Sequence, residues 1–146
     1  MDANETRLIQ DECRELVIRL THYSDHGQHA QAVDLFTADG TWIRGGKPYT
    51  GRAEMLQSFA RGSGTQLIRH FTSNIRIDVK DERSAEGVTY YIAFNHDPGT
   101  ATPNMPLPFD PPFSLGEWHD SFVRTPAGWR FARREVKRLF QRAGAH

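Results

Sequence analysis

Apolar residues recur at steps of three and four in the first part of the chain, between residues 5 and 24. That spacing aligns them on one face of a helix and so predicts an amphipathic helix. Turn-forming residues occupy positions 24–27, and a shorter helical pattern then reaches Phe36 before Gly40 ends it. We expect a helical hairpin with Asp25 at its corner.

Residues 41–49 predict a short strand hairpin, because strand-forming side chains flank the tight turn Gly45-Gly46. Thr50 follows as a candidate N-cap of a third helix, which ends at the break formed by residues 62–64. The pattern then changes to an alternation typical of strands, over residues 66–80, 85–96, 115–124 and 129–139. Two of the connections are short turns, which fit antiparallel hairpins.

Helices followed by a run of antiparallel strands predict an α+β fold, in which three N-terminal helices cover one face of a curved, mostly antiparallel sheet. A cone that encloses a pocket is one solution of this arrangement. Residues 97–114 hold six prolines together with several apolar side chains, Phe113 among them. A loop this long and apolar is not a solvated linker; it is either functional or disordered, and its apolar content favours a lid or an interface over disorder.

Composition and charge narrow the functional classes. The 146 residues fit a single domain, 1–146, and 18 basic residues balance 18 acidic ones. No basic stripe favours nucleic acid or an anionic membrane, and the charged N-terminus lacks the apolar segment of a signal peptide. The single cysteine, Cys13, excludes an internal disulfide and suits a reducing compartment. We expect a cytoplasmic protein that binds neither nucleic acid nor membrane.

Five short segments stand out by their order and spacing: Tyr23-Ser24-Asp25, residues 35–42 (LFTADGTW), Tyr49-Thr50-Gly51-Arg52, residues 69–74 (RHFTSN) and Gly128-Trp129-Arg130-Phe131. Together they resemble the SnoaL-like branch of the nuclear transport factor two superfamily, the cone-shaped α+β barrels, over nearly the whole chain. The pattern is similar to scytalone dehydratase, bile acid 7α-dehydratase and hexachlorocyclohexane dehydrochlorinase. In these enzymes a pocket histidine acts as a base and an aspartate orients it.

The resemblance implies that His70 is the base and Asp25 its partner. A neutral imidazole accepts a proton near neutral pH once a carboxylate fixes its tautomer, so such a dyad suits abstraction of an acidic C–H proton. Tyr23 is a candidate donor to a substrate or leaving-group oxygen. Candidate substrate contacts are Trp42, Asn74, Tyr90, Phe113 and Trp118. Scytalone dehydratase has a second pocket histidine where this chain places Tyr90 or Tyr91, so the substrate of that enzyme is not implied.

Strand alternation makes the assignment of His70 conditional. His70 shares one face of its predicted strand with Asn74, while Ile75, Ile77 and Val79 share the other face. If His70 faces a pocket, the apolar set needs a second subunit to cover it, which predicts a homo-oligomer formed through the sheet face. If the apolar set is core, His70 is exposed unless a bulge reverses the register midway.

The leading functional prediction is a cofactor-independent lyase, such as a dehydratase, that acts on a small hydrophobic or aromatic cyclic ligand. A polyketide cyclase or ketosteroid-type isomerase in the same pocket is the second. A noncatalytic binding module, like the small subunit of a ring-hydroxylating dioxygenase, is the third. The histidines near Asp25, at positions 22, 26 and 29, form no tight metal-binding motif, so no metal ligands are expected.

Overall fold

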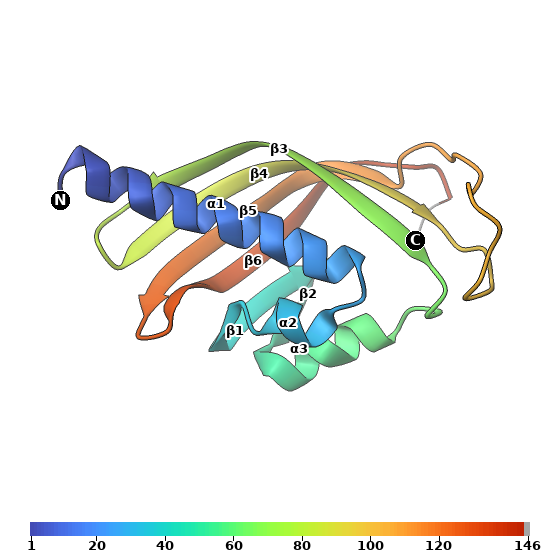
Figure 1. Cartoon of the computed structure of the whole chain (residues 1–146), viewed down its shortest axis with the longest axis horizontal. Helices are drawn as coiled ribbons and strands as arrows, with labels where there is room; N and C mark the ends of the chain where they lie inside the picture. The colour runs from blue at the N-terminus through green and yellow to red at the C-terminus, as the bar shows by residue number, and fades with distance from the viewer. Residues whose placement is uncertain (145–146) are drawn as a thin grey trace.

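The computed structural model describes residues 1–144. Its helices are α1 (Ala3–Asp25), α2 (His29–Val33) and α3 (Gly51–Ala60). Its strands are β1 (Phe36–Arg44), β2 (Lys47–Thr50), β3 (Leu67–Val79), β4 (Ser84–His96), β5 (Ser114–Thr125) and β6 (Gly128–Gln141). The strands form one sheet in the order β2-β1-β6-β5-β4-β3, with β1 parallel to β6 and every other pair antiparallel (Figure 1). The α+β architecture expected from the sequence is confirmed.

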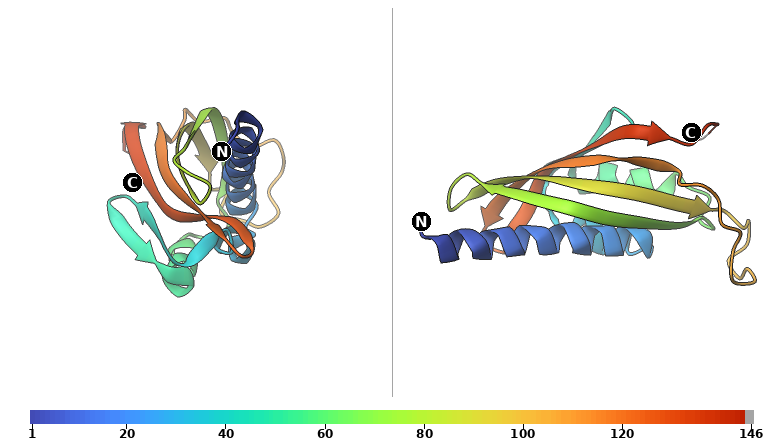
Figure 2. Two further views of the ribbon diagram at one scale, coloured as in Figure 1. Left: turned by 90° about the vertical axis from the view of Figure 1, so that its left-hand side faces the viewer. Right: turned by 90° about the horizontal axis from the view of Figure 1, so that it is seen from above.

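Helix α1 begins where Asp2 and Glu5 cap each other. The Asp2 carboxylate accepts the backbone N–H of Glu5 at 2.9 Å, and the Glu5 carboxylate accepts that of Asp2 at 2.8 Å. The predicted apolar stripe is buried along this helix, and it comprises Ile9, Cys13, Leu16, Val17 and Leu20. This stripe packs against the sheet along β3, with the helix axis following the length of the sheet (Figures 1 and 2).

The helices cover one face of a curved sheet (Figure 2). Side chains from that face join the apolar stripe of α1 in one buried cluster, which includes Trp42, Ile77, Trp118, Phe122 and Phe131. Burial raises the pKa of the Cys13 thiol in this cluster to about 12. In the described part of the chain, no helix is both long enough and apolar enough to span a bilayer.

The segment after Asp25 differs in one respect from the sequence-based expectation. Helix α2 ends at Val33, and Phe36 opens strand β1 instead of closing the helix. The reason is tertiary, because Phe36 pairs with Phe131 of the parallel strand β6 and stacks on its ring at 5.2 Å between centroids. The hairpin that turns at Gly45-Gly46 is confirmed.

Strand β3 changes its facing direction at a bulge. Ser73 pairs with Tyr90 and Arg76 pairs with Val88, so β3 holds one more residue than β4 between these two pairs. Asn74 lies at this point in the left-handed region, with φ of 50°, a conformation that asparagine tolerates better than most residues.

Because of the bulge, the residues that face inward change from even to odd positions along β3. Ile68, His70 and Thr72 are partly buried before it, and Ile75, Ile77 and Val79 pack into the core after it, with Ile77 only 4% exposed. The expectation that this apolar set needs a second subunit to cover it is therefore wrong. The bulge alternative is the one that the structure adopts.

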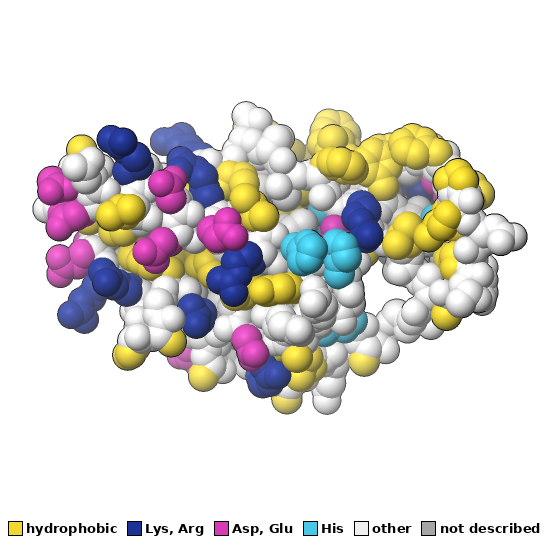
Figure 3. Space-filling view, in the orientation of Figure 1, with side chains coloured by type: hydrophobic (Ala, Val, Ile, Leu, Met, Phe, Trp, Pro, Cys, Tyr) yellow, Lys and Arg dark blue, Asp and Glu magenta, His cyan; other side chains and the backbone are white. Residues whose placement is uncertain are grey.

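Residues 97–113 connect β4 to β5 and pack at one end of the sheet. The His96 Nδ1 and Asp110 Oδ2 atoms are 3.1 Å apart, and the rings of Phe94 and Phe109 lie 5.5 Å apart. Apolar side chains gather on this end of the surface in Figure 3. Phe109 and Met105 are among the exposed hydrophobic residues, at 87% and 66% exposure.

Candidate active site

The C-terminal corner of α1 meets β3 through Asp25 and His70. Asp25 Oδ1 lies 2.6 Å from the ring Nδ1 of His70, and Asp25 Oδ2 accepts the backbone N–H of His70 at 2.8 Å. The Asp25 side chain is 4% exposed and the His70 side chain 19%. Because a buried carboxylate requires a donor, the proton of a neutral His70 belongs on Nδ1, and Nε2 is left as the acceptor.

His70 lines a cavity of about 120 Å³ under the curved sheet. Its aromatic walls come from β1, α3, β4, β5 and the residue before β5, and they are Trp42, Phe59, Tyr91, Trp118 and Phe113. The ring of Trp118 lies 5.5 Å from that of His70 and stacks on Tyr91 at 5.0 Å. Cavities on the order of 150 Å³ hold benzene, so this space suits about one six-membered ring.

A buried ion pair forms the floor of the cavity beside Trp118. Arg134 donates from Nε and Nη2 to the two oxygens of Asp120, at 2.7 and 2.8 Å, and the two side chains are 1% and 0% exposed. The guanidinium carbon lies 4.2 Å from the Trp118 ring centroid. Asp120 neutralises the charge of Arg134, while the Nη1 atom has no hydrogen-bond partner among residues 1–144.

Two further arginines, Arg44 of β1 and Arg138 of β6, line the cavity on the side away from β3. Arg44 donates to Ser58 Oγ at 3.1 Å and lies over the rings of Trp42 and Phe59. Arg138 lies over Phe113, 5.2 Å from its ring centroid. Burial, together with the positive charge of Arg138, lowers the pKa of Arg44.

Two buried polar atoms of cavity-lining residues have no hydrogen-bond partner in the described chain. They are the hydroxyl Oγ of Ser24 and the indole Nε1 of Trp42. An unsatisfied buried donor costs about 1–3 kcal/mol, so most are retained for a reason. A polar ligand in the cavity would give these groups partners.

The structure brings together some of the residues singled out from the sequence and separates others. Trp42, Phe113 and Trp118 line the cavity with His70. The other three candidates, Tyr23, Asn74 and Tyr90, do not line it.

Each of these three candidates has a physical reason for its position. Tyr23 packs partly buried at the edge of the core, with the Arg19 guanidinium 5.8 Å from its ring. Asn74 is the residue at the bulge of β3. Tyr90 is on the outer face of the sheet and 49% exposed, because alternation along β4 turns its neighbour Tyr91 inward.

The sequence interpretation gave no pocket role to several polar cavity residues, among them Arg44, Ser114, Arg134 and Arg138, and named Tyr91 only as an alternative to Tyr90. Tyr91 OH and Ser114 Oγ are 3.3 Å apart in the cavity wall. A register shift between β5 and β6 turns Arg134 inward and leaves its neighbour Arg133 exposed. The alternation of Trp118, Asp120 and Phe122 along β5 placed a carboxylate on the apolar face and was the available signal for a buried cationic partner.

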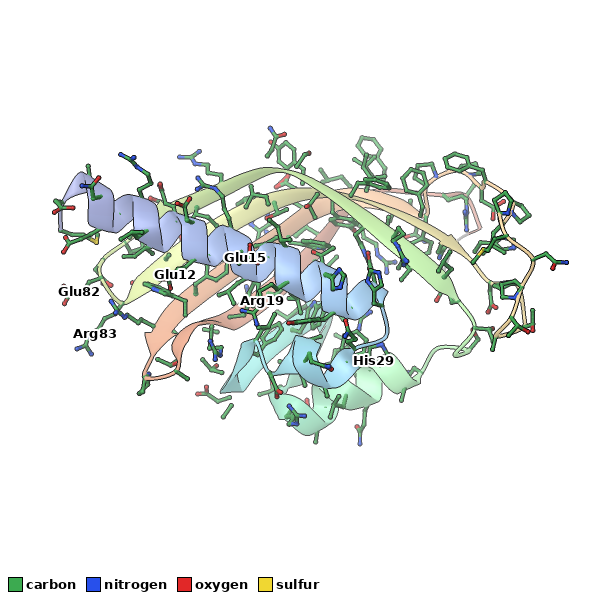
Figure 4. All side chains as sticks on the ribbon, viewed as in Figure 1. Glu12, Glu15, Arg19, His29, Glu82 and Arg83 are labelled. Atoms are coloured by element: carbon green, nitrogen blue, oxygen red, sulfur yellow. The ribbon has the colours of Figure 1, made fainter. Side chains whose placement is uncertain are left out.

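A wider groove of about 560 Å³ lies at the far end of the molecule, between the N-terminus of α1 and the turns of the sheet. Glu12, Glu82 and Arg83 mark it in Figure 4. This groove contains no histidine, so the smaller cavity is the better candidate for acid–base chemistry. Within residues 1–144, no three His, Cys, Asp or Glu side chains cluster in a way that could hold a metal ion.

The sequence profile of the SnoaL-like domain matches residues 5–135 of the chain. No curated protein matches this chain. Among solved structures, a protein from Novosphingobium aromaticivorans described as NTF2-like with a cystatin-like fold is similar at 26% identity and a TM-score of 0.76, covering 98% of this chain and 91% of that one.

Two further solved structures are similar in fold and carry enzyme names. A proposed scytalone dehydratase from Novosphingobium aromaticivorans is 19% identical with a TM-score of 0.80, and covers 97% of this chain and 91% of its own. A type 2 hexachlorocyclohexane dehydrochlorinase is 13% identical with a TM-score of 0.76, and the match covers 99% of this chain and 96% of that one. These likenesses establish the NTF2-like fold.

Proposed function

The chain belongs to the SnoaL-like domain family, and from this premise we propose that it is a cofactor-independent lyase, of the dehydratase or dehydrohalogenase type, acting on a small cyclic substrate. The observation that carries the proposal is the 2.6 Å contact between His70 Nδ1 and the buried carboxylate of Asp25, at the wall of an aromatic cavity. Two solved structures that share the fold, one named a proposed scytalone dehydratase and one a hexachlorocyclohexane dehydrochlorinase, carry names of this reaction type.

In the proposed reaction, His70 acts as the general base. Its Nε2 takes a proton from a carbon next to an electron-withdrawing group, and the C–H electron pair forms the new double bond. The leaving group departs from the adjacent carbon with its bonding pair, as halide, or as water once the imidazolium has returned the proton. Asp25 stabilises the imidazolium while it exists. A positioned base of this kind contributes about 10²–10⁴-fold to the rate.

The leaving oxygen or the developing negative charge needs a donor. Tyr91 and Arg134 fit this role, since both line the cavity and both contact Trp118, whose ring lies beside that of His70. The phenol of Tyr91 is near Ser114 Oγ, and Arg134 keeps its Nη1 hydrogens unused by Asp120. This assignment replaces Tyr23, which lies outside the cavity lining.

The test is turnover of hydroxylated and halogenated cyclic compounds by the wild type and by His70→Gln. We expect the variant to lose about 10²–10⁴-fold in kcat for the compound that the wild type converts. His96→Gln is the matched control, because His96 also pairs with an aspartate but lies outside the cavity. Equal turnover by wild type and His70→Gln would reject His70 as the base.

The product distinguishes the remaining possibilities. A product lighter by water or hydrogen halide supports the lyase. A product of unchanged mass replaces it with an isomerase or cyclase that uses the same base. Binding without conversion of any compound replaces it with a noncatalytic binding module.

A homo-oligomer formed through the outer face of the sheet is part of the proposal. The residues Ile75, Ile77 and Val79 do not support it, because they face the core. Exposed apolar residues on the outer face do. Phe71 is 63% exposed, Tyr90 49% and Phe140 68%. Exposed apolar side chains grouped on one face are typical of protein interfaces.

A further inference from the structure

The charged residues that line the cavity are all basic. They are Arg44, Arg134 and Arg138; His70, neutral as the base, is a fourth basic group, and no aspartate or glutamate among residues 1–144 lines the cavity. The chain as a whole has a formal net charge of zero, so this excess of positive charge is local to the cavity. A cavity lined in this way attracts an anionic ligand.

The four basic groups are not equivalent. Asp25 pairs with His70, and Asp120 pairs with Arg134 through two hydrogen bonds. Arg44 and Arg138 have no carboxylate partner in the described chain; their hydrogen bonds go to Ser58 and Gln141. Arg44 is partly buried, so leaving its guanidinium without a counter-ion is costly, whereas Arg138 is exposed at the cavity rim and free to bind an anion; a ligand carboxylate would serve both.

The position of these two arginines relative to the base sets the shape of the ligand. Arg44 is on β1 and Arg138 on β6, which are neighbours in the sheet, whereas His70 is on β3 at the far edge, beyond β5 and β4. Aromatic side chains lie between them, with Trp118 and Tyr91 beside His70, and Trp42 and Phe59 beneath Arg44. A ligand with an acidic group at one end and a ring next to it would contact the two arginines with the first and the aromatic walls with the second.

We propose that the substrate is a cyclic carboxylate, whose carboxylate is bound by Arg44 and Arg138 while its ring lies against the aromatic walls and presents a C–H bond to His70. This inference rests on the proposed function, because it names the substrate class of the same cavity. The two arginines act as specificity-determining residues, and the buried Nε1 donor of Trp42, next to Arg44, is a further group that a ligand oxygen would satisfy.

The proposal is tested by titrating the full chain calorimetrically with benzoate, benzamide and acetate. Benzoate and benzamide have nearly the same shape and differ in charge, and acetate carries the charge without the ring. We expect benzoate to bind about tenfold or more tightly than either of the others, since a charge-assisted bidentate contact is about twice as strong as a neutral one.

Arg138→Gln and Arg44→Gln should each remove most of the preference for benzoate over benzamide. Arg138 is exposed, so its replacement leaves the fold intact and decides the question even if Arg44→Gln unfolds. Arg133→Gln is the matched control, on the same strand but outside the cavity lining, and should keep the preference unchanged.

Equal affinities for benzoate and benzamide in the wild type, or a preference that survives in Arg138→Gln, would overturn the proposed binding of a substrate carboxylate by the arginines. Acetate binding as tightly as benzoate would overturn the proposed contact of a substrate ring with the aromatic walls. His70→Gln separates this inference from the proposed function. If the variant keeps the preference for benzoate and no compound is turned over by the wild type, the carboxylate site stands and the lyase fails.

Discussion

One carboxylate, that of Asp25, binds both the ring and the backbone of His70, at 2.6 and 2.8 Å. The first contact fixes which ring nitrogen carries the proton, and the second ties the C-terminal corner of α1 to strand β3. The backbone carbonyl of Asp25 also accepts a hydrogen bond from Arg69 Nη1 at 3.3 Å. The catalytic geometry and the helix–sheet junction therefore depend on the same residue.

Asp25→Asn should lower kcat by about 10²–10³-fold, because an amide cannot stabilise the imidazolium and can orient its NH₂ group toward Nδ1. Ring nitrogen NMR shifts of His70 would report the change of tautomer alongside the kinetics. Asp110→Asn, at the His96 pair outside the cavity, should leave kcat unchanged. A variant at Asp25 with normal kcat would contradict the orienting role.

Cys13 should resist thiol reagents in the native protein. It is fully buried, and burial raises its pKa to about 12, so the reactive thiolate is absent near pH 8. Labelling is expected only as denaturant unfolds the chain, at a rate that follows the loss of helical circular dichroism. Complete labelling under native conditions before any loss of that signal would contradict the buried position.

Acid should destabilise the protein partly through His29. Burial and the charge of Arg44 lower the pKa of His29 below its usual value near 6.5. The unfolded chain then binds a proton at His29 more readily than the folded one, so this group has no effect above about pH 6.5 and destabilises the fold as pH falls below it.

His29→Phe removes the titrating group and keeps a flat ring against Phe59, on which His29 stacks at 4.2 Å between centroids. The Tm of this variant should fall less between pH 7 and pH 5 than that of the wild type. Parallel Tm curves for the two proteins would show that His29 does not contribute.

Gly116 of β5 is needed for the close approach of β6. A Cβ at this position would clash with the backbone oxygen of Lys137, so Gly116→Ala requires the strands to shift. We expect a loss of about 1–3 kcal/mol and a fall in Tm of roughly 3–10 °C. Gly62→Ala is the control, since its Cβ would meet only an ordinary contact at 3.9 Å, and its Tm should not change measurably.

The outer face of the sheet should hold two copies together. Wild type is expected to have a solution mass of twice the 16.7 kDa chain, and Phe71→Asp should reduce it to that of a single chain. Light scattering after size exclusion measures both. A wild-type mass of one chain would remove the homo-oligomer from the proposal.

Sequence patterns predicted the long elements well, because their periodicity is set by burial of one face. Helix α1 and strands β3 to β6 begin and end within a few residues of the expected positions. The Gly45-Gly46 turn, whose residues favour a tight two-residue hairpin, also made the β1–β2 hairpin predictable. The end of α2 was not predictable. Phe36 pairs with a strand nearly a hundred residues further along the chain, and the local sequence pattern carries no signal for that pairing.

Within the site, His70, Asp25, Trp42 and Trp118 were predictable, whereas the inward-facing residues of β3, β4 and β6 were not all predictable. A bulge adds a single residue, so it leaves the strand signal intact and reverses the facing of everything beyond it. That is why Asn74 was assigned to the pocket, and why Arg134 was not. The alternation of Ile75, Ile77 and Val79 after an asparagine was the available signal in β3.

The bulge at Asn74 also divides β3 into two halves that can be altered independently. Substitutions at Ile68 or Thr72 change the neighbourhood of the base, while substitutions at Ile75 or Ile77 change how α1 is anchored. A mutant library at positions 68 and 72, which spares the contacts of Arg69 and His70 to Asp25, would therefore explore new ligand preferences at little expense in folding, whereas deleting Asn74 alone would reverse the facing of one half of the strand.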